Sequence, residues 1–334
     1  MNYETRISKN RTKLEEVIPL ETPFIMFVEP SDMCNFQCKF CPTGDRDMIK
    51  TIKGRNHGSM SMDIYKKLID DASTFPDKLK VLRFFKDGEP LMNKNLPEMV
   101  RYAKEKKVAD FVDTTVNGSL FTHEMSDRLI QSGIDQINIS IEGTSSEEYK
   151  EFSKYDGSFE KFYSNIKYLC DHSGDCHILV KINEDVISAE SKQRFLDLFG
   201  PIADGVALEH TISCWPDYEL TKVEPNKNVG IYGQAITSVD VCPYIFYSIA
   251  VNSNGTVSLC FLDWARNLII GNIENESIVD IWNGDLINEY RIDFLLGNRK
   301  DHSFCGKCGQ LSQGMPDNID EYKDTILKNI KGYK

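Results

Sequence analysis

The sequence predicts an α/β fold, built as a parallel sheet or partial (β/α)6 barrel with a small second domain after it. From about residue 24 to residue 212, apolar strand-like runs alternate with amphipathic helical stretches, which is the pattern of βαβ units. Parallel crossovers share one hand, so consecutive units curl the same way round. The chain has 334 residues. That length allows about two domains at roughly 150 residues each, and the pattern changes after about residue 214.

Six apolar runs supply the strands of this sheet. They are FIMFV (24–28), VLRFF (81–85), FVDTTV (111–116), QINISI (136–141), HILVKI (177–182) and GVALEHTI (205–212). Between them, apolar residues recur at helical spacing in otherwise polar stretches. This spacing predicts helices over 62–73, 97–107, 123–133 and 159–172.

The C-terminal part has a different character. Pro, Gly, Asn and charged residues over 215–233 predict a loop. Asn254-Gly255 lies between two apolar strands and predicts a hairpin over 246–263. A short helix is expected over 277–291, and apolar residues at helical spacing predict another over 317–334, packed on the barrel. The apolar residues of this last helix are Ile319, Tyr322, Ile326 and Ile330.

Composition narrows the class of protein. The 39 Lys and Arg against 51 Asp and Glu give a net charge of −12, which argues against broad nucleic-acid binding. No apolar run approaches the roughly 18 residues that span a bilayer, and the polar N-terminus lacks the apolar centre of a signal peptide. We therefore expect a cytoplasmic protein with no nucleic-acid or membrane partner.

Seven of the ten cysteines form two candidate ligand sets. In a reducing cytosol, clustered cysteines indicate metal binding or catalysis more often than disulfides. Cys34, Cys38 and Cys41 follow the first strand directly, at the strand end where α/β barrels place reactive groups. Three thiolates can hold three irons of a cubane cluster and leave the fourth iron open. The alternative is zinc or three unrelated thiols, although no fourth His or Cys lies nearby to close a zinc site.

The second set is Cys242, Cys260, Cys305 and Cys308. Cys260 follows Gly255 by five residues, just after the predicted hairpin turn, and Cys305-Gly-Lys-Cys308 forms a compact pair. Spacing alone leaves both zinc and a fully ligated iron–sulfur cluster open.

Side-chain alternation in the last three strands predicts a polar barrel interior. On its inner face we expect Asn138, Ser140 and Glu142 of the fourth strand, Lys181 and Asn183 of the fifth, and Glu209, Thr211 and Ser213 of the sixth. Glu142, Lys181 and Glu209 are the acid/base candidates. The alternative for each is a plain ion pair between Lys181 and one of the carboxylates.

The same alternation assigns residues to the opposite, apolar face of the sixth strand. Cys214 and His210 fall there, together with Leu208 and Ile212. We therefore expect His210 to be a hydrogen-bonded core histidine. For Cys214, structural filler is favoured over a thiol that donates a hydrogen atom.

Cys34-x3-Cys38-x-Phe40-Cys41 after the first strand of such a barrel resembles the radical S-adenosylmethionine (radical SAM) superfamily, over about residues 20–215. In that family the open iron binds the amino and carboxylate groups of SAM. The reduced cluster cleaves SAM to methionine and a 5′-deoxyadenosyl radical, which abstracts a hydrogen atom from the substrate.

The resemblance also implies the SAM contacts. Phe40 occupies the position that packs against adenine, and Asp87-Gly88-Glu89-Pro90 matches the GGEP-type motif except that Asp87 replaces the first Gly. That motif binds the methionine amino group partly through its backbone, so the change leaves the local turn geometry open. The full set of cofactor contacts expected is Phe40, Gly88, Glu89, Pro90, Asn117, Ser140, Glu142 and Asn183.

The C-terminal part resembles the SPASM/twitch domains of many radical SAM enzymes. The matching features are Cys242-Pro243, Gly255-x4-Cys260 and the stretch 271–291. No cysteine follows Cys308, so the resemblance is to the twitch type, with one auxiliary [4Fe–4S] cluster on four cysteines. We expect the barrel over 20–215, this domain over 236–312 and a helical extension over 313–334.

These resemblances imply a radical SAM oxidoreductase that dehydrogenates a small polar substrate, sugar-like or aminocyclitol. An interior base would remove a proton, the auxiliary cluster would accept an electron, and a flavodoxin- or ferredoxin-type donor would reduce the enzyme. One alternative is an epimerase with Cys214 as hydrogen-atom donor. Another is a peptide-modifying maturase, against which weigh the roughly 20 residues before the first strand, too few for a peptide-recognition module. A zinc-stabilised binding protein is the alternative that is not an enzyme.

Overall fold

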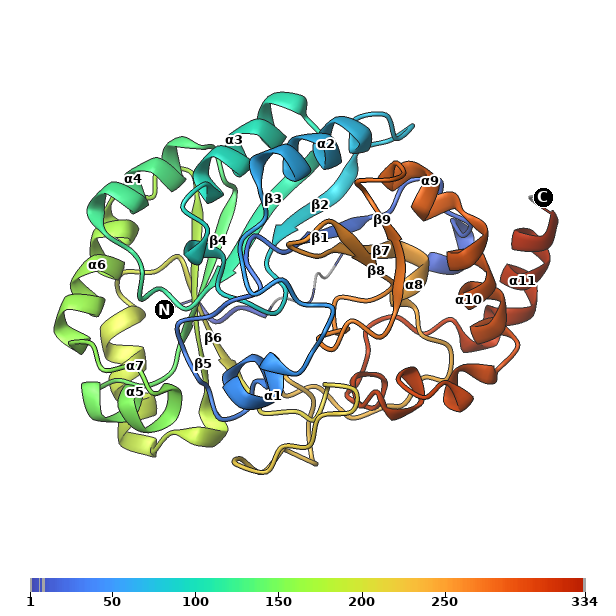
Figure 1. Cartoon of the computed structure of the whole chain (residues 1–334). Coiled ribbons are helices and arrows are strands. Elements are labelled where there is room, and N and C mark those ends of the chain that lie inside the picture. Colours follow the sequence, from blue (N-terminus) through green and yellow to red (C-terminus); the bar gives the residue numbers. More distant parts are fainter. Residues whose placement is uncertain (1, 6, 8–9, 333–334) are drawn as a thin grey trace.

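A computed structural model describes residues 2–5, 7 and 10–332 of the chain (Figure 1). Its strands form one nine-stranded sheet in the order β6-β5-β4-β3-β2-β1-β7-β8-β9. The strands are β1 (Ile25–Val28), β2 (Leu79–Phe84), β3 (Ala109–Val116), β4 (Gln136–Ile141), β5 (His177–Asn183), β6 (Gly205–Glu209), β7 (Ser248–Val251), β8 (Thr256–Ser258) and β9 (Ile269–Asn272).

Strands β1 to β6 are all parallel to their neighbours, as the alternating pattern predicts. Helices follow an arc outside these strands (Figure 1). They are α2 (Met62–Ala72), α3 (Leu96–Lys106), α4 (His123–Gln131), α5 (Ser146–Ser153), α6 (Phe159–Asp171) and α7 (Ala189–Phe199), with the short α1 (Arg46–Lys50) in the loop after β1. The arrangement is the partial (β/α)6 barrel that was expected. Among the described residues, no helix is both long and apolar enough to cross a bilayer.

Local sequence fixes where most of these helices begin. Five of them follow a Ser or Thr whose side-chain oxygen accepts a hydrogen bond from the amide three residues later, which pairs an amide that has no partner within the helix. These caps are Ser61, Thr122, Ser145, Ser158 and Ser188. Helices α5 and α7 were not among the ranges predicted from spacing.

Apolar side chains alternate with polar ones along β4. On β4, Ile137, Ile139 and Ile141 are at most 1% exposed. At the end of β3, Gly118 has a φ of 75°, and an added Cβ would lie 2.9 Å from Ile139 and 3.0 Å from Ile166 of α6. Only glycine fits this close approach in a left-handed conformation. The outer helices can therefore pack directly on the strand ends that carry the polar residues.

The C-terminal part continues the same sheet. Strand β7 pairs in parallel with β1, and β8 and β9 follow antiparallel. The predicted hairpin turn is present, with Gly255 at a φ of 84°. The single helix expected over 277–291 is two helices, α9 (Ile278–Asn283) and α10 (Asp285–Leu295), because the chain leaves the helical conformation at Gly284, where ψ is 168°. A further short helix, α8 (Tyr244–Tyr247), precedes β7.

The last helix differs from its prediction. Helix α11 (Lys323–Gly332) begins later than residue 317 and packs chiefly on α10, away from the barrel helices (Figure 1). Ile319, Ile326 and Ile330 are buried as expected, but Tyr322 is 41% exposed. The helical spacing identified an apolar stripe correctly, whereas the surface that this stripe covers depends on long-range packing.

The chain's beginning covers the open edge of the barrel. Tyr3 forms a parallel bridge with Val206 of β6. The Glu4 amide donates to the Val206 carbonyl at 2.9 Å, and the Glu4 carboxylate lies 2.9 Å from His177 Nε2. This pairing satisfies backbone groups that an edge strand otherwise leaves free.

Candidate active site

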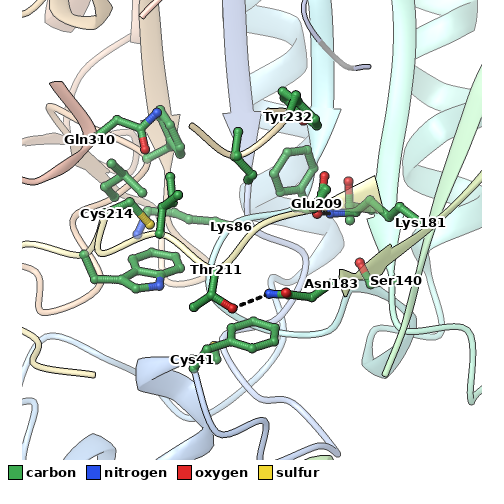
Figure 2. A pocket seen from close by; sticks show the side chains of 18 of the residues that line it. Cys41, Lys86, Ser140, Lys181, Asn183, Glu209, Thr211, Cys214, Tyr232 and Gln310 are labelled. Atoms are coloured by element: carbon green, nitrogen blue, oxygen red, sulfur yellow. Dashed lines mark hydrogen bonds and ion pairs between the residues drawn. The ribbon is translucent and has the colours of Figure 1, made fainter. Parts of the chain in front are cut away.

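The carboxyl ends of the parallel strands line a cavity of about 500 Å³ (Figure 2). The first cysteine set lies in its wall, as do all the predicted catalytic and cofactor-binding residues of the barrel except Pro90. The predicted residues that line it are Cys34, Cys38, Phe40, Cys41, Gly88, Glu89, Asn117, Ser140, Glu142, Lys181, Asn183, Glu209 and Cys214. Residues from six strand ends, up to 180 positions apart in sequence, thus meet at one place.

The first cysteine set sits on a tight loop after β1. The Cys41 amide donates to the Cys38 carbonyl at 3.2 Å, and the Gly44 amide donates to the Cys41 carbonyl at 2.9 Å. An added Cβ on Gly44 would lie 2.9 Å from the Cys38 amide nitrogen, so a larger residue would push the loop open. Burial raises the pKa of the Cys34 thiol to about 12, and Glu89 and Cys41 add to this. Buried thiols so placed bind metal as thiolates only when a cation compensates their charge, so this donor set fits an iron–sulfur cluster.

The second cysteine set gathers from three separate segments. Burial raises the pKa of both Cys242 and Cys305 to about 12, and each thiol also feels the charge of Cys308. The thiol of Cys260 is buried among the other three. Tetrahedral zinc would bring its sulfur ligands to roughly 4 Å from each other. Within the described ranges, no three His, Cys, Asp or Glu side chains are arranged to hold one metal ion. A four-iron cluster takes one thiolate per iron and so does not need the four sulfurs to converge on a single ion.

The segment after β2 is fastened to the cysteine loop. An added Cβ on Gly88 would lie 2.5 Å from the Met33 carbonyl oxygen and closer still to that of Ser31. The Glu89 amide donates to the Met33 carbonyl at 2.8 Å. No residue but glycine therefore fits at position 88. Asp87, which replaces the first Gly of the motif, is not among the residues with positive φ, so its backbone does not need glycine.

Glu89 is fully engaged by backbone amides. Its Oε1 accepts from the Leu91 amide at 3.0 Å, and its Oε2 accepts from the Asn117 amide at 2.7 Å. Burial raises the pKa of Glu89 to about 7, against the lowering effect of these two amides. Its carboxylate thus links the ends of β2 and β3, and Asn117 in turn donates to Asn35 in the cysteine loop at 2.8 Å.

The ends of β5 and β6 carry an ion pair in the cavity wall. Lys181 Nζ donates to Glu209 Oε2 at 2.7 Å, and each side chain is 12% exposed. Glu209 Oε1 is buried and has no hydrogen-bond partner among the described residues. Nearby, Asn183 donates to the Thr211 hydroxyl at 2.7 Å (Figure 2). Burial raises the pKa of Glu142 to about 7, while Lys181 and a hydrogen bond with Cys38 lower it.

Beyond Glu209 the alternation argument was right for Thr211, which lines the cavity, but wrong for its neighbours. Strand β6 ends at Glu209, so the two-residue period no longer applies, and Cys214, His210 and Ile212 all line the cavity. Ser213, expected to face inward, is not among the lining residues. His210 is hydrogen-bonded, as expected, but to carboxylates and not within an apolar core: Nδ1 lies 2.8 Å from Asp185 and Nε2 lies 3.2 Å from Glu184.

Cys214 occupies a junction between the two cysteine sets. The Cys308 thiol lies 3.9 Å from the Cys214 carbonyl oxygen, and Gly309 packs so closely on the Ser213 carbonyl that no Cβ fits. Burial raises the pKa of the Cys214 thiol to about 12, with Cys308 and Cys41 contributing. The second cysteine set is therefore directly behind the cavity wall.

The C-terminal part also contributes side chains that the sequence reading missed. Phe261 lines the cavity and stacks on Phe27 of β1 at 4.6 Å between ring centres, and Tyr244 meets Phe261 edge-on at 5.1 Å. Gln310 of the same part lines it as well, as does Lys86 from the barrel segment after β2. The only sequence signal for the two aromatic residues was their closeness to Cys242 and Cys260.

The profile of the radical SAM superfamily matches residues 28–199, and that of the SPASM iron–sulfur cluster-binding domain matches residues 242–309. An AdoMet-dependent heme synthase from Nitratidesulfovibrio vulgaris is 24% identical over 84% of this chain and 82% of that protein. The S-adenosyl-L-methionine-dependent 2-deoxy-scyllo-inosamine dehydrogenase of Niallia circulans is 23% identical over 85% of this chain and 92% of that protein.

Solved structures agree on the fold. BtrN in complex with AdoMet and 2-DOIA superposes with a TM-score of 0.55 at 21% identity, over 89% of this chain and 97% of that one. Streptococcus suis SuiB bound to the precursor peptide SuiA gives a TM-score of 0.60 at 15% identity, over 92% and 74% of the two chains. The family match brings with it SAM, a SAM-binding [4Fe–4S] cluster and auxiliary iron–sulfur binding in the C-terminal domain. The chain belongs to the radical SAM superfamily and carries a C-terminal SPASM domain.

Proposed function

We propose that this enzyme dehydrogenates a small polar substrate, sugar-like or aminocyclitol, and that one auxiliary [4Fe–4S] cluster on Cys242, Cys260, Cys305 and Cys308 accepts an electron from it. One observation carries the proposal. The wall of one cavity carries both the three-cysteine set and the Lys181–Glu209 pair, which is 12% exposed and has one unpartnered carboxylate oxygen among the described residues.

The SAM-binding cluster would be held by the thiols of the first set, Cys34, Cys38 and Cys41. When bound there, the cluster and SAM supply a carbon radical that takes a hydrogen atom from the substrate. The chain's own part is to bind and orient SAM. The backbone at Gly88 and Glu89, fixed on the cysteine loop, receives the methionine end. The side chains that complete the SAM site are Phe40, Pro90, Asn117, Ser140, Glu142 and Asn183.

Glu209 is assigned as the base. Lys181 holds its Oε2 and so fixes the direction of the carboxylate, while Oε1 is left to accept the proton of a substrate hydroxyl or ammonium group. The substrate gives up one hydrogen atom from carbon, one proton to Glu209 and one electron, and a C=O or C=N bond forms. An oxygen that is buried and unpaired before substrate arrives is costly, so the substrate's own donor would satisfy it.

The size of the cavity favours a small substrate. About 500 Å³ must hold SAM and substrate together, and ligand sites of this kind span roughly 300–1,000 Å³. The Niallia circulans relative, named as a dehydrogenase of an aminocyclitol, supports this choice. A peptide-modifying role, as the precursor-peptide complex of SuiB suggests, would need most of the peptide to lie outside the cavity.

One specific observation favours a second candidate. Cys214 lines the cavity, so a thiol is available to return a hydrogen atom to a substrate radical, which would make the enzyme an epimerase. Turnover of the Cys214→Ala variant in deuterated water separates the two. A dehydrogenase keeps its turnover and puts no solvent deuterium on the product carbon, whereas an epimerase loses turnover.

The direct test uses anaerobically purified, iron-loaded enzyme with SAM, a reductant and a panel of aminocyclitols and sugars. We expect one oxidised product with about one 5′-deoxyadenosine formed per product. Glu209→Gln should lower product formation by about 100-fold, the lower range for loss of a general base, while Glu219→Gln, on the exposed surface, serves as the matched control. Product formation unchanged in Glu209→Gln would remove Glu209 from the base role.

A further inference from the structure

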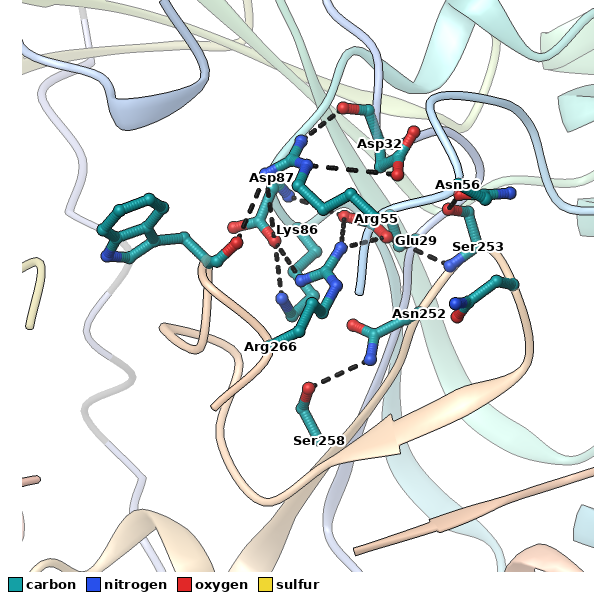
Figure 3. A network of polar contacts seen from close by, with 12 residues as sticks. Glu29, Asp32, Arg55, Asn56, Lys86, Asp87, Asn252, Ser253, Ser258 and Arg266 are labelled. Carbon is teal, nitrogen blue, oxygen red and sulfur yellow. Dashed lines mark hydrogen bonds and ion pairs between the residues drawn. The ribbon is translucent and has the colours of Figure 1, made fainter. Parts of the chain in front are cut away.

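Six charged side chains form a buried network between the barrel and the C-terminal domain (Figure 3). Each is at most 1% exposed, and three are cations and three are anions. They are Glu29, Asp32, Arg55, Lys86, Asp87 and Arg266. Buried charges persist in proteins when they are paired and hydrogen-bonded. Each member of this network therefore has to stay beside its partners, because a member that moved away would leave a buried charge unpaired.

Arg266 is the member that the C-terminal domain contributes. Its Nη2 donates to both carboxylate oxygens of Glu29, at 2.9 and 2.7 Å, and its Nη1 donates to Asp87 Oδ2 at 2.6 Å. Its own φ of 58° is left-handed, a conformation that non-glycine residues adopt only where the surroundings enforce it. An added Cβ on Gly54 would lie 2.5 Å from Arg266 Cβ. The side chain is therefore held tightly from both sides.

Asp87 is the acceptor on which the cations converge. Lys86 Nζ lies 2.6 Å from the same Oδ2, and Arg55 Nη1 lies 4.0 Å away. Burial alone would raise the pKa of Asp87, but Lys86, Arg266 and Arg55 outweigh it and lower the pKa well below its usual value. Asp87 is thus a permanent anion directly before Gly88, and it stands where the family motif has a glycine without a side chain.

Glu29 makes a second contact between the network and the C-terminal domain. It follows β1 directly, and besides Arg266 its Oε2 accepts from the Ser253 amide in the C-terminal hairpin at 3.0 Å. Asp32, three residues on, accepts from the Gly58 amide at 2.7 Å and the His57 amide at 3.1 Å. The cysteine loop and the segment after β2 are thereby anchored to a common set of charges.

We propose that Arg266 is a positioning residue for SAM. By holding Asp87 and Glu29 it fixes Gly88 and Glu89 against the cysteine loop, so that SAM affinity depends on a residue of the C-terminal cluster-binding domain. The proposal rests on the SAM contacts assigned above to Gly88 and Glu89. Asp87, the departure from the family motif, is what makes this coupling possible, because a glycine there would leave Arg266 bonded to Glu29 but without a side-chain partner in the segment after β2.

The test measures SAM binding to iron-loaded enzyme by anaerobic equilibrium dialysis, without substrate. Arg266→Lys keeps the charge, so the network stays neutral, but a single ammonium cannot bridge Glu29 and Asp87 as the planar guanidinium does. We expect about a 10-fold weaker Kd for SAM, the loss of one strong contact, and a smaller SAM-induced change in the EPR spectrum of the reduced cluster. For reductive SAM cleavage, KM for SAM should rise while kcat at saturating SAM stays constant.

Arg291→Lys is the matched control. Arg291 is also a buried arginine of the C-terminal part, but it contacts the carbonyls of Ile245 and Trp282, at 3.0 and 3.2 Å, and not the network. The Arg291→Lys variant should have lower thermal stability. Its Kd for SAM should stay within about 2-fold of the wild-type value, well short of the tenfold change expected for Arg266→Lys. A second variant, Asp87→Asn, should weaken SAM binding as well. The double variant Arg266→Lys/Asp87→Asn should raise the Kd for SAM by less than the product of the two single fold-changes, because the two residues share one contact.

Wild-type SAM affinity in Arg266→Lys would overturn the proposal, and so would an equal loss in Arg291→Lys, which would indicate general loosening. The failure of the proposed function looks different. Wild-type enzyme would then bind and cleave SAM normally but oxidise no substrate, and the effect of Arg266 on SAM affinity would remain.

Discussion

Replacing Gly88 with alanine tests the close approach on which the proposed SAM site depends. The new Cβ would lie 2.5 Å from the Met33 carbonyl oxygen, whereas carbon–oxygen contacts in proteins stand at about 3.3 Å or more. The atoms that crowd it belong to the backbone of Ser31, Asp32 and Met33, so rotation of a side chain cannot relieve the overlap. The segment after β2 and the cysteine loop must therefore part by roughly 1 Å, the scale of displacement that costs about 100-fold in rate when it misplaces reacting groups.

We expect Gly88→Ala to lower SAM cleavage by about 100-fold and to reduce the free energy of unfolding by about 1–3 kcal/mol, the usual cost of overpacking. The assays are 5′-deoxyadenosine formation under anaerobic reduction, and urea unfolding of the iron-loaded protein. Gly58→Ala is the control, because the nearest atom to its added Cβ is the Asn56 side-chain nitrogen at 3.4 Å. If Gly88→Ala cleaves SAM at the wild-type rate, the cysteine loop and the segment after β2 do not meet as described.

Other variants probe the remaining parts of the site. Cys41→Ala should abolish SAM cleavage and lower the iron content from about eight to about four atoms per chain, as metal analysis would report; retention of cleavage would contradict the ligand assignment. Cys305→Ala should lose about four irons too, yet it should still cleave SAM and fail only in substrate oxidation. Lys181→Met leaves the Glu209 carboxylate buried and unpaired, so urea unfolding should report a loss of about 3 kcal/mol. The double variant Lys181→Met/Glu209→Leu should recover most of that stability, and a double variant as unstable as Lys181→Met would show that the ion pair is not the cause.

Much of the barrel could be predicted because its signals are local. Apolar alternation located the six parallel strands, and residues such as Ser61 and Thr122 mark helix starts through a hydrogen bond only three residues long. The polar face of β4 and β5 followed from the same two-residue period, and Ser140, Glu142, Lys181 and Asn183 do line the cavity.

What could not be predicted depends on where strands stop and on which distant segments meet. The sixth strand ends three residues earlier than its apolar pattern suggested, which moved Cys214 and His210 into the cavity wall. The extension of the sheet by β7 beside β1 joins residues more than 220 positions apart. Nothing in the sequence around Arg266 predicts its role. Arg266 comes close to its partners Glu29 and Asp87 only because β7 pairs with β1.

The central claim is that the cluster held by Cys34, Cys38 and Cys41 binds SAM through an iron that no protein side chain ligates. Electron–nuclear double resonance on the reduced enzyme, with nitrogen-15 in the amino group of SAM, tests it most directly. The account predicts a nitrogen-15 coupling to that cluster, present in the wild type and absent in Cys41→Ala. A spectrum without the coupling, in protein that is fully loaded with iron and saturated with SAM, would contradict it.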